Sequence, residues 1–394
     1  MLIPYSRQQI EADDISEDSR VLKSDFLTTG PEIELFEKAL AESVNARFAV
    51  VCSSGTAALH LTTLVLGLGP QDTIVTSPIT FLATANCARY VGAEVLFSDV
   101  DEKTINLSPS ILEKVIRSSS QKISAIYVVH FAGQPADMES IFDISQQYKI
   151  PVVEDASHAL GATYTLKNGE TIQVGNNRHA VMAVFSFHPV KHVAAGEGGA
   201  VTTNDENLYE RLKRFRNHGM KHDASQGVWF YEMSELGYNY RLSDIQAALA
   251  RNQLKKLPAS LKRRHEIANE YQERIEEIFG ELVRPVDIRS NVYHAYHLYP
   301  VSISFELLNI TRDQVMRRLR EEGIGTQVNY IPVHTQPYYQ KRYGTNFGDF
   351  PNAEKYYAEA LSLPMYAGLP PNGVQRVVQA LEEVLNGRPS KKGK

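Results

Sequence analysis

The chain has 394 residues, about two to three times the length of a typical domain, so we expect at least two lobes around a large core. Hydrophobic residues make up 43% and charged residues 22%, which is a folded globular composition and excludes a disordered or fibrous chain. The net charge is -5 with both signs interspersed, so the sequence offers no basic surface for nucleic acid or an anionic membrane.

The cysteines and the chain ends add further limits. Cys52 and Cys87 lie in apolar segments, so we expect buried, reduced thiols in a cytoplasmic protein, without a zinc site. The first residues lack a basic region followed by an apolar core, and no apolar run approaches the ~18 residues of a membrane span. The basic tail at 388–394 is expected to be solvated.

From about residue 45 to 205, short β-rich runs alternate with helical patterns. This alternation predicts an α/β fold, with a mostly parallel sheet covered by helices on both faces. About seven strands are expected, at 48–52, 73–76, 94–99, 125–130, 151–154, 181–187 and 199–203. Helices are expected to begin near Thr56, near Thr80 and after Ser108. Apolar residues spaced by three and four predict helices over 111–118 and 138–149.

The composition changes after Leu242, where a long charged helical stretch runs to about Ile278 and is interrupted at Pro258. Beyond it, the patterns predict a strand over 298–304 and helices over 312–322 and 373–385. We therefore expect a large α/β domain over 15–250 and a smaller α+β domain over 251–394. The N-terminal segment 1–14 is expected to join the smaller domain.

The segment 52–59, Cys-Ser-Ser-Gly-Thr-Ala-Ala-Leu, turns from a strand into a helix through small hydroxyl residues and one glycine. Free backbone N–H groups and the positive end of the helix dipole meet at such a turn, which suits a phosphate group. An ordinary Ser/Thr helix cap is the alternative. The segment is not a Walker loop, because no Gly-Lys-Ser/Thr follows.

A second candidate lies where an apolar strand ends in Glu154 and Asp155, with His158 three residues later. Functional carboxylates in open α/β sheets gather at the carboxyl ends of strands. A buried acid here needs a cationic partner, because an unpaired charge is costly to bury. Asp155 as a helix cap is an equally weighted alternative.

The third candidate is Lys191, which follows a strand and precedes a cluster of glycines. Its apolar and histidine neighbours favour partial burial, a lowered pKa and a nucleophilic amine over the ordinary solvated lysine. His188 and His192 lack a convincing third metal ligand, and Pro189 argues against a shared helical face, so no metal is expected.

A phosphate-binding turn, a strand-end aspartate and a lysine after a later strand together match the requirements of pyridoxal 5'-phosphate (PLP). The lysine forms a Schiff base with the cofactor, and the aspartate keeps the pyridine nitrogen protonated so that the ring accepts electrons. Phe81 is available to cover the ring.

Five motifs resemble the DegT/DnrJ/EryC1/StrS family of nucleotide-sugar aminotransferases, which are fold-type I PLP-dependent enzymes. They occur in family order as Ser-Gly-Thr-Ala-Ala-Leu at 54–59, Glu-Asp-Ala-Ser-His-Ala-Leu-Gly at 154–161, Phe-Ser-Phe-His-Pro-Val-Lys at 185–191, Gly-Glu-Gly-Gly at 196–199 and Gly-Tyr-Asn-Tyr-Arg-Leu-Ser-Asp-Ile-Gln-Ala-Ala at 237–248. Within the family, the segments 3–8, 77–81 and 130–135 resemble most the transaminases of pseudaminic acid synthesis.

The resemblance implies roles for individual residues. Lys191 is the implied catalytic lysine and proton shuttle. The other implied cofactor contacts are Asp155 at the pyridine nitrogen, His158 at the ring or its 3-oxygen, Phe81 stacked on the ring, and Gly55, Thr56 and Ser186 at the phosphate. Asn239 is expected to reach the phosphate of the neighbouring subunit's cofactor, which implies a homodimer with shared active sites.

Four residues are expected to contact the sugar nucleotide, namely Tyr5, Arg7, Tyr330 and His334. For each taken singly, a surface charge or a core aromatic is an equal alternative. Family members that dehydrate carry histidine in place of the lysine, so Lys191 favours transamination, although the adjacent His192 makes the register worth checking.

The predicted activity is transfer of an amino group from L-glutamate to C4 of a UDP-linked 2-acetamido-2,6-dideoxy-4-hexulose, on the route to pseudaminic acid. The alternatives are amination of another nucleotide-linked 4-keto-6-deoxy sugar, a non-catalytic PLP-binding protein, and an NAD-linked sugar dehydrogenase, whose glycine fingerprint is missing.

Overall fold

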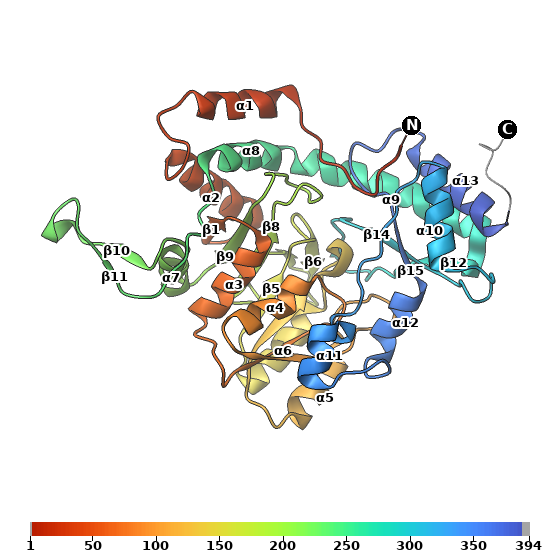
Figure 1. Cartoon of the computed structure of the whole chain (residues 1–394), viewed down its shortest axis with the longest axis horizontal. Helices are drawn as coiled ribbons and strands as arrows, with labels where there is room; N and C mark the ends of the chain where they lie inside the picture. Colours follow the sequence, from red (N-terminus) through yellow and green to blue (C-terminus); the bar gives the residue numbers. More distant parts are fainter. Residues whose placement is uncertain (1, 388–394) are drawn as a thin grey trace.

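The computed structural model describes residues 2–387, so the basic tail at 388–394 lies outside the described residues (Figure 1). All seven predicted strands are confirmed and form one sheet, in the order β1-β9-β8-β5-β4-β2-β3. Their bounds are β1 Phe48–Cys52, β2 Thr73–Thr76, β3 Glu94–Phe97, β4 Ile123–Val129, β5 Val152–Asp155, β8 Met182–Ser186 and β9 Gly199–Thr203. Only β9 runs antiparallel to its neighbours, β1 and β8, so the sheet is mostly parallel as predicted.

Helices cover both faces of this sheet. They are α2 Pro31–Val44, α3 Gly55–Val65, α4 Leu82–Tyr90, α5 Pro109–Ser118, α6 Met138–Tyr148 and α7 Glu206–Arg216. Successive strand residues point to opposite faces. In β4, Ile126 and Val128 join the core under α2, α5 and α6, whereas Ala125 and Tyr127 join the core under α3, α4 and α7. Two apolar layers therefore hold the sheet rigid beneath its carboxyl edge.

The C-terminal part has a separate apolar core. The charged stretch is two helices, α8 Asp244–Lys255 and α9 Leu257–Phe279, and Pro258 lies in the first turn of α9, where its missing N–H costs nothing. A three-stranded antiparallel sheet follows, in the order β12-β14-β15. The remaining elements are β12 Val283–Pro285, β14 Tyr299–Ile303, β15 Ala360–Leu363, α10 Arg312–Glu321, α11 Pro337–Tyr343, α12 Pro351–Glu359 and α13 Gly373–Leu385.

The N-terminal residues belong to the C-terminal core. Ile3 is fully buried and pairs with Ile324, and its backbone bonds Gly323 and Gly325, each at 2.8 Å. The expected joining of the whole segment 1–14 to the smaller lobe stays a prediction. The exact domain boundaries stay a prediction, because α8 packs against both α1 and α2.

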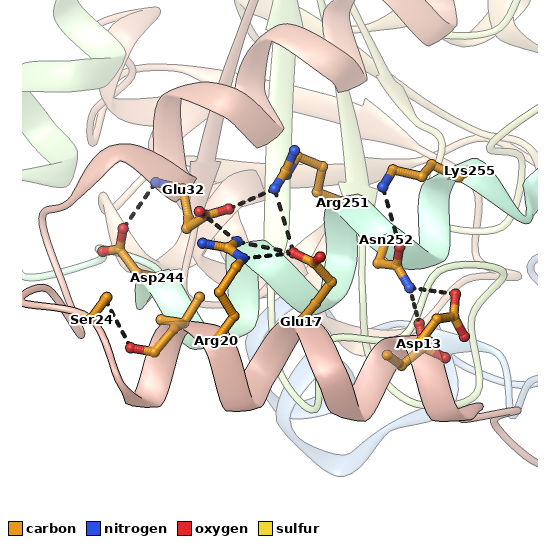
Figure 2. Close-up of polar contacts among 11 residues, drawn as sticks. Asp13, Glu17, Arg20, Ser24, Glu32, Asp244, Arg251, Asn252 and Lys255 are labelled. Atoms are coloured by element: carbon orange, nitrogen blue, oxygen red, sulfur yellow. Dashed lines mark hydrogen bonds and ion pairs between the residues drawn. The ribbon is translucent and has the colours of Figure 1, made fainter.

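Helix α1, Ala12–Leu22, lies along α8 and is held by polar contacts (Figure 2). The buried Asp14 carboxylate accepts hydrogen bonds from Asn252 at 2.8 Å and Gln253 at 2.7 Å. The buried Glu32 of α2 pairs with Arg20 at 2.7 Å and Arg251 at 3.0 Å. This network fixes α1 and the chain that leads from Tyr5 to it.

Short strands complete the fold. β6 Thr163–Thr165, β7 Thr171–Gln173 and β13 Val292–Tyr293 form a small sheet, and β10 Met220–His222 and β11 Tyr231–Met233 form a hairpin that projects from the body (Figure 1). Both cysteines are buried and unpaired, as predicted. None of the described helices is both long and apolar enough to cross a lipid bilayer.

Candidate active site

A cavity of about 640 Å³, here called the main cavity, opens at the carboxyl ends of β4, β5 and β8. It brings together nine of the twelve site residues predicted from the sequence, namely Tyr5, Gly55, Thr56, Phe81, Asp155, His158, Ser186, Lys191 and Tyr330. The other three, Arg7, Asn239 and His334, do not line it. Residues far apart in the sequence therefore meet at the sheet edge where open α/β sheets bind ligands.

At one end of the main cavity, the first turn of α3 packs against the end of β8. Ser54 caps α3, with its hydroxyl accepting a hydrogen bond from Ala57 N–H at 3.1 Å. A β-carbon on Gly55 would lie 3.0 Å from Ser186 Cβ and 3.2 Å from Ser186 Oγ, so glycine permits this close approach. The turn thus brings helix N–H groups and the Ser186 hydroxyl together, as a phosphate group requires.

The two acids at the end of β5 point to opposite sides of the strand. Glu154 is buried and contacts His130 Nε2 at 2.8 Å, away from the main cavity. Asp155 lines the main cavity, and its carboxylate accepts hydrogen bonds from Thr84 Oγ1 at 2.6 Å and Ser157 N–H at 3.2 Å. Asp155 therefore combines a local turn contact with a fixed position facing the main cavity.

The amine of Lys191 lies 3.4 Å from Nε2 of His297. Burial lowers the pKa of Lys191 from its ordinary 10.5 to about 8, although the nearby Asp155 carboxylate acts in the opposite direction. The His297 ring lies 4.4 Å from that of His158, centroid to centroid, and burial lowers the pKa of both histidines well below the usual range. Lys191 therefore lies beside two neutral imidazoles.

His297 was not among the residues predicted from the sequence. It lies in irregular backbone just before β14, 106 residues after Lys191. In the sequence, His297 is a histidine inside an apolar segment. A histidine that is merely buried in the core has the same pattern, so the sequence does not single out His297.

Aromatic side chains form another wall of the main cavity. Phe81 precedes α4 and is 57% exposed, so its ring is free to stack on a planar ligand. The Tyr330 ring lies 6.2 Å from it, and Tyr330 Oη contacts His158 Nε2 at 3.0 Å. Tyr5 Oη donates a hydrogen bond to Asn329 Oδ1 at 3.0 Å, which fixes the N-terminal segment at the main cavity.

Comparison with known proteins identifies the family. The sequence profile of the DegT/DnrJ/EryC1/StrS aminotransferase family matches residues 8–382. The chain belongs to this family. It is 39% identical to the spore coat polysaccharide biosynthesis protein SpsC of Bacillus subtilis, over 98% of this chain and 97% of SpsC. It is 38% identical to the UDP-4-amino-4,6-dideoxy-N-acetyl-beta-L-altrosamine transaminase of Campylobacter jejuni, over 93% of each chain.

Solved structures of aminotransferases share the fold. Helicobacter pylori PseC, an aminotransferase involved in pseudaminic acid biosynthesis, superposes with a TM-score of 0.89 at 30% identity, over 98% of this chain and all of PseC. Spr1654 of Streptococcus pneumoniae in its PLP form gives a TM-score of 0.89 at 26% identity, over 99% of this chain and all of Spr1654. The protein is a PLP-dependent nucleotide-sugar aminotransferase with the fold-type I architecture.

The residues of this aminotransferase fit PLP. The turn at Gly55 and Ser186 suits the phosphate, Asp155 lines the same cavity, and Lys191 provides a buried amine with a lowered pKa. The exposed ring of Phe81 offers a stacking surface for the pyridine. The role of each residue toward the cofactor remains a proposal.

His334 does not lie where a sugar contact was expected. Its side chain is fully buried, its Nε2 contacts Glu354 Oε1 at 3.0 Å, and its ring lies 4.6 Å from that of Phe350. The preceding Val333 donates its N–H to Pro78 O at 2.9 Å, which turns the segment into the core. In this aminotransferase His334 therefore stabilises the packing of α11 and α12 on the sheet and is not carried into the proposed substrate site.

Arg7 and Asn239 also lie outside the main cavity. Arg7 is exposed and lines a second, adjacent cavity. Asn239 pairs through its backbone with Asn217 in an isolated bridge. A residue that serves the neighbouring subunit's site would lie outside its own, so the position of Asn239 is compatible with the predicted contact, which stays a prediction.

Proposed function

We propose that this aminotransferase moves the amino group of L-glutamate to C4 of a UDP-linked 2-acetamido-2,6-dideoxy-4-hexulose, in a route to pseudaminic acid. The single observation that carries amino transfer is the position of Lys191, a buried amine with a pKa lowered to about 8, in one cavity with Asp155. The choice of sugar is supported by the names of the Campylobacter jejuni and Helicobacter pylori relatives.

In the proposed reaction, bound PLP supplies a conjugated ring that accepts the electron pair released at the donor's α-carbon. Lys191 would hold the cofactor through its amine, and the same amine would move the proton to and from the donor's α-carbon. A pKa of about 8 favours this work, because a base near the working pH both takes and returns a proton. With the keto sugar as acceptor, the same lysine would move the proton in the opposite direction.

Other residues hold the reacting groups in place. The Asp155 carboxylate, fixed by Thr84 and Ser157, would accept a hydrogen bond from the pyridine N–H and stabilise the positive charge of the pyridine. Gly55 and Thr56 at the first turn of α3, with Ser186, would hold the phosphate, and His158 would orient the ring. Phe81 would stack on the ring and exclude water from it.

The proposed sugar site lies at the aromatic wall, where Tyr5 and Tyr330 face the main cavity. Tyr330 is bonded to His158, and burial raises the pKa of its phenol, so it remains a neutral donor over the working pH range. We further propose a homodimer in which Asn239 reaches the cofactor phosphate of the neighbouring subunit.

A second candidate is amination of a different nucleotide-linked 4-keto-6-deoxy sugar. The 39% identity with SpsC of Bacillus subtilis favours it, because SpsC is named for spore coat polysaccharide and not for pseudaminic acid. Both candidates use the same lysine and the same donor chemistry. They differ in the nucleotide, the C2 substituent and the C5 configuration of the acceptor.

The deciding experiment compares kcat/KM for UDP- and dTDP-linked 4-keto-6-deoxy sugars of both C5 configurations, with L-glutamate as donor and products read by mass spectrometry. We expect the highest value for a UDP-linked 2-acetamido sugar. A clear preference for a dTDP-linked sugar without the acetamido group would overturn the pathway and leave amino transfer standing.

A further inference from the structure

The main cavity is short of positive charge. Among the described residues that line it, Lys191 is the only lysine or arginine, and its amine is committed to the reaction. A dicarboxylic amino donor brings two carboxylates to this place. Burying a carboxylate without a cationic partner is costly, so the charge has to be met from outside the main cavity.

A second cavity of about 490 Å³ adjoins the main cavity and also has Lys191 in its wall. We call it the basic cavity, because the other cations that line it are Arg7, Lys255, Lys256, Arg263 and Arg264, against one acid, Glu11. It lies between the N-terminal segment and the junction of α8 and α9.

Two of these cations are already neutralised within the protein. Lys256 pairs with Asp13 at 2.7 Å and Asp14 at 2.9 Å, and Arg263 pairs with Glu266 at 3.0 Å. Their charges are not available to a ligand in full.

Arg7, Lys255 and Arg264 form no ion pair with any residue that the structure describes. Among the described residues, the Lys255 amine donates a hydrogen bond only to the amide oxygen of Asn252, at 3.3 Å (Figure 2). These three cations leave the basic cavity with uncompensated positive charge.

Arg264 is the strongest indication of a ligand. Its side chain is 3% exposed, and its Nη1 donates only to backbone carbonyl groups, Tyr296 O at 2.8 Å and Met365 O at 3.3 Å. Its Nε has no hydrogen-bond partner among the described residues. Burial lowers the pKa of Arg264 to about 10. A buried guanidinium without a carboxylate pays a desolvation cost that an anionic ligand would offset.

We propose that the basic cavity binds the carboxylates of a dicarboxylic amino donor, the α-carboxylate on Arg264 and the second carboxylate on Arg7 and Lys255. This inference rests on the proposed function and names the subsite that selects its donor. A guanidinium matches a carboxylate through two parallel hydrogen bonds. Lys191 lies in the wall of both cavities, so the basic cavity adjoins the lysine that the donor must displace. Small side chains in the lining, Ala194, Ala259 and Ala367, leave room for the carbon chain of the donor.

The test uses a double variant of the rim, Arg7→Gln with Lys255→Gln, and a separate Arg264→Lys variant that keeps the charge and loses the planar fork. Arg317→Gln on α10, an exposed cation remote from both cavities, is the matched control. Single-turnover absorbance of the holoenzyme gives the apparent Kd of L-glutamate, and steady-state assays give the KM of the keto sugar. Calorimetry measures binding of glutarate, an unreactive dicarboxylate, to PLP-free protein.

We expect the double variant to raise the apparent Kd of L-glutamate about tenfold or more, the size expected for loss of charge-assisted hydrogen bonds. The limiting rate and the KM of the keto sugar should stay within about twofold, and glutarate binding should weaken in parallel. L-alanine, which lacks the second carboxylate, should lose reactivity with Arg264→Lys but not with the rim variant. The control should match the wild type in all assays.

An unchanged Kd for L-glutamate in the rim variant overturns the inference and points to cations from a partner subunit. A raised KM for the keto sugar alone also overturns it, because the basic cavity would then bind the diphosphate. A different result would contradict the proposed function and not this inference: the wild-type enzyme would convert L-glutamate to 2-oxoglutarate but aminate no keto sugar. Because Arg7 and Lys255 are both exposed, the rim variant should fold, and the test does not depend on whether Arg264→Lys folds.

Discussion

Replacing Lys191 with methionine should stabilise the PLP-free protein at neutral pH while removing its activity. The pKa of Lys191 falls from 10.5 to about 8 in the folded chain, chiefly because of burial. At about 1.4 kcal/mol per pKa unit, this fall of about 2.5 corresponds to about 3 kcal/mol of cost for keeping the charged amine in place. Water in the open main cavity screens part of that cost, so we expect a gain of about 1–3 kcal/mol in the free energy of unfolding.

The pH dependence identifies the charge as the cause. Below pH 8, Lys191 is protonated in both the folded and the unfolded chain, so the wild type bears the full cost. Between pH 8 and 10.5 the unfolded chain binds the proton and the folded chain does not, so wild-type stability rises with pH. The advantage of Lys191→Met should therefore be largest near pH 7 and fall by more than half at pH 9.5.

Urea unfolding of both PLP-free proteins at the two pH values measures this difference. PLP must be absent, because a ligand that binds only the folded wild type would add stability of its own. Lys262→Met, at an exposed lysine on α9, is the control and should change stability by less than about 0.5 kcal/mol. A methionine variant that is no more stable than the wild type at pH 7, or whose advantage does not change with pH, would refute the reasoning.

Two further predictions concern the cofactor site. Asp155→Asn should weaken PLP retention at least about tenfold and slow both half-reactions, because a neutral amide does not stabilise a protonated pyridine. Unchanged single-turnover rates at saturating PLP would show that Asp155 does not belong to the site. Mixing Lys191→Ala with an inactivating Asn239 variant should restore activity in heterodimers that contain one intact site. If the subunits exchange, as shown by mass spectrometry, and no activity returns, the site is not shared.

The sequence predicted the central sheet well, because its strands are short apolar runs buried on both faces. The reversal of β9 was not predicted, since an antiparallel strand inside a buried sheet has the same composition as a parallel one. Seven of the nine site residues in the main cavity lie at or just after the carboxyl ends of parallel strands, which share one edge. The other two, Tyr5 and Tyr330, come from the N-terminal segment and from the chain after α10. No local pattern gives the separate contact of His297 with Lys191 or the burial of His334, because both depend on how the C-terminal part packs onto the sheet.

For Arg7, the sequence did not predict which of the two cavities its side chain lines. The sequence indicated a cation near the substrates, and the structure places this cation on the rim of the basic cavity, outside the main cavity. Residue type and sequence position were sufficient to nominate Arg7. The choice between two adjoining cavities required the path of the N-terminal segment. That path is set by the polar contacts of α1 with Asn252 of α8 and with Lys256, which follows α8.

The meeting of Tyr5 with Asn329, residues 324 apart in the sequence, has a consequence for the order of events on the ribosome. The backbone partners of Ile3 are Gly323 and Gly325. The N-terminal residues therefore cannot form their native contacts until most of the chain has been synthesised. The central sheet can close earlier, because β1 to β9 end at Thr203. A nascent chain stopped before Gly323 should therefore contain a folded central sheet with Lys191 and Asp155. Tyr5 would still lack its contact with Asn329, so this chain should not retain a sugar nucleotide.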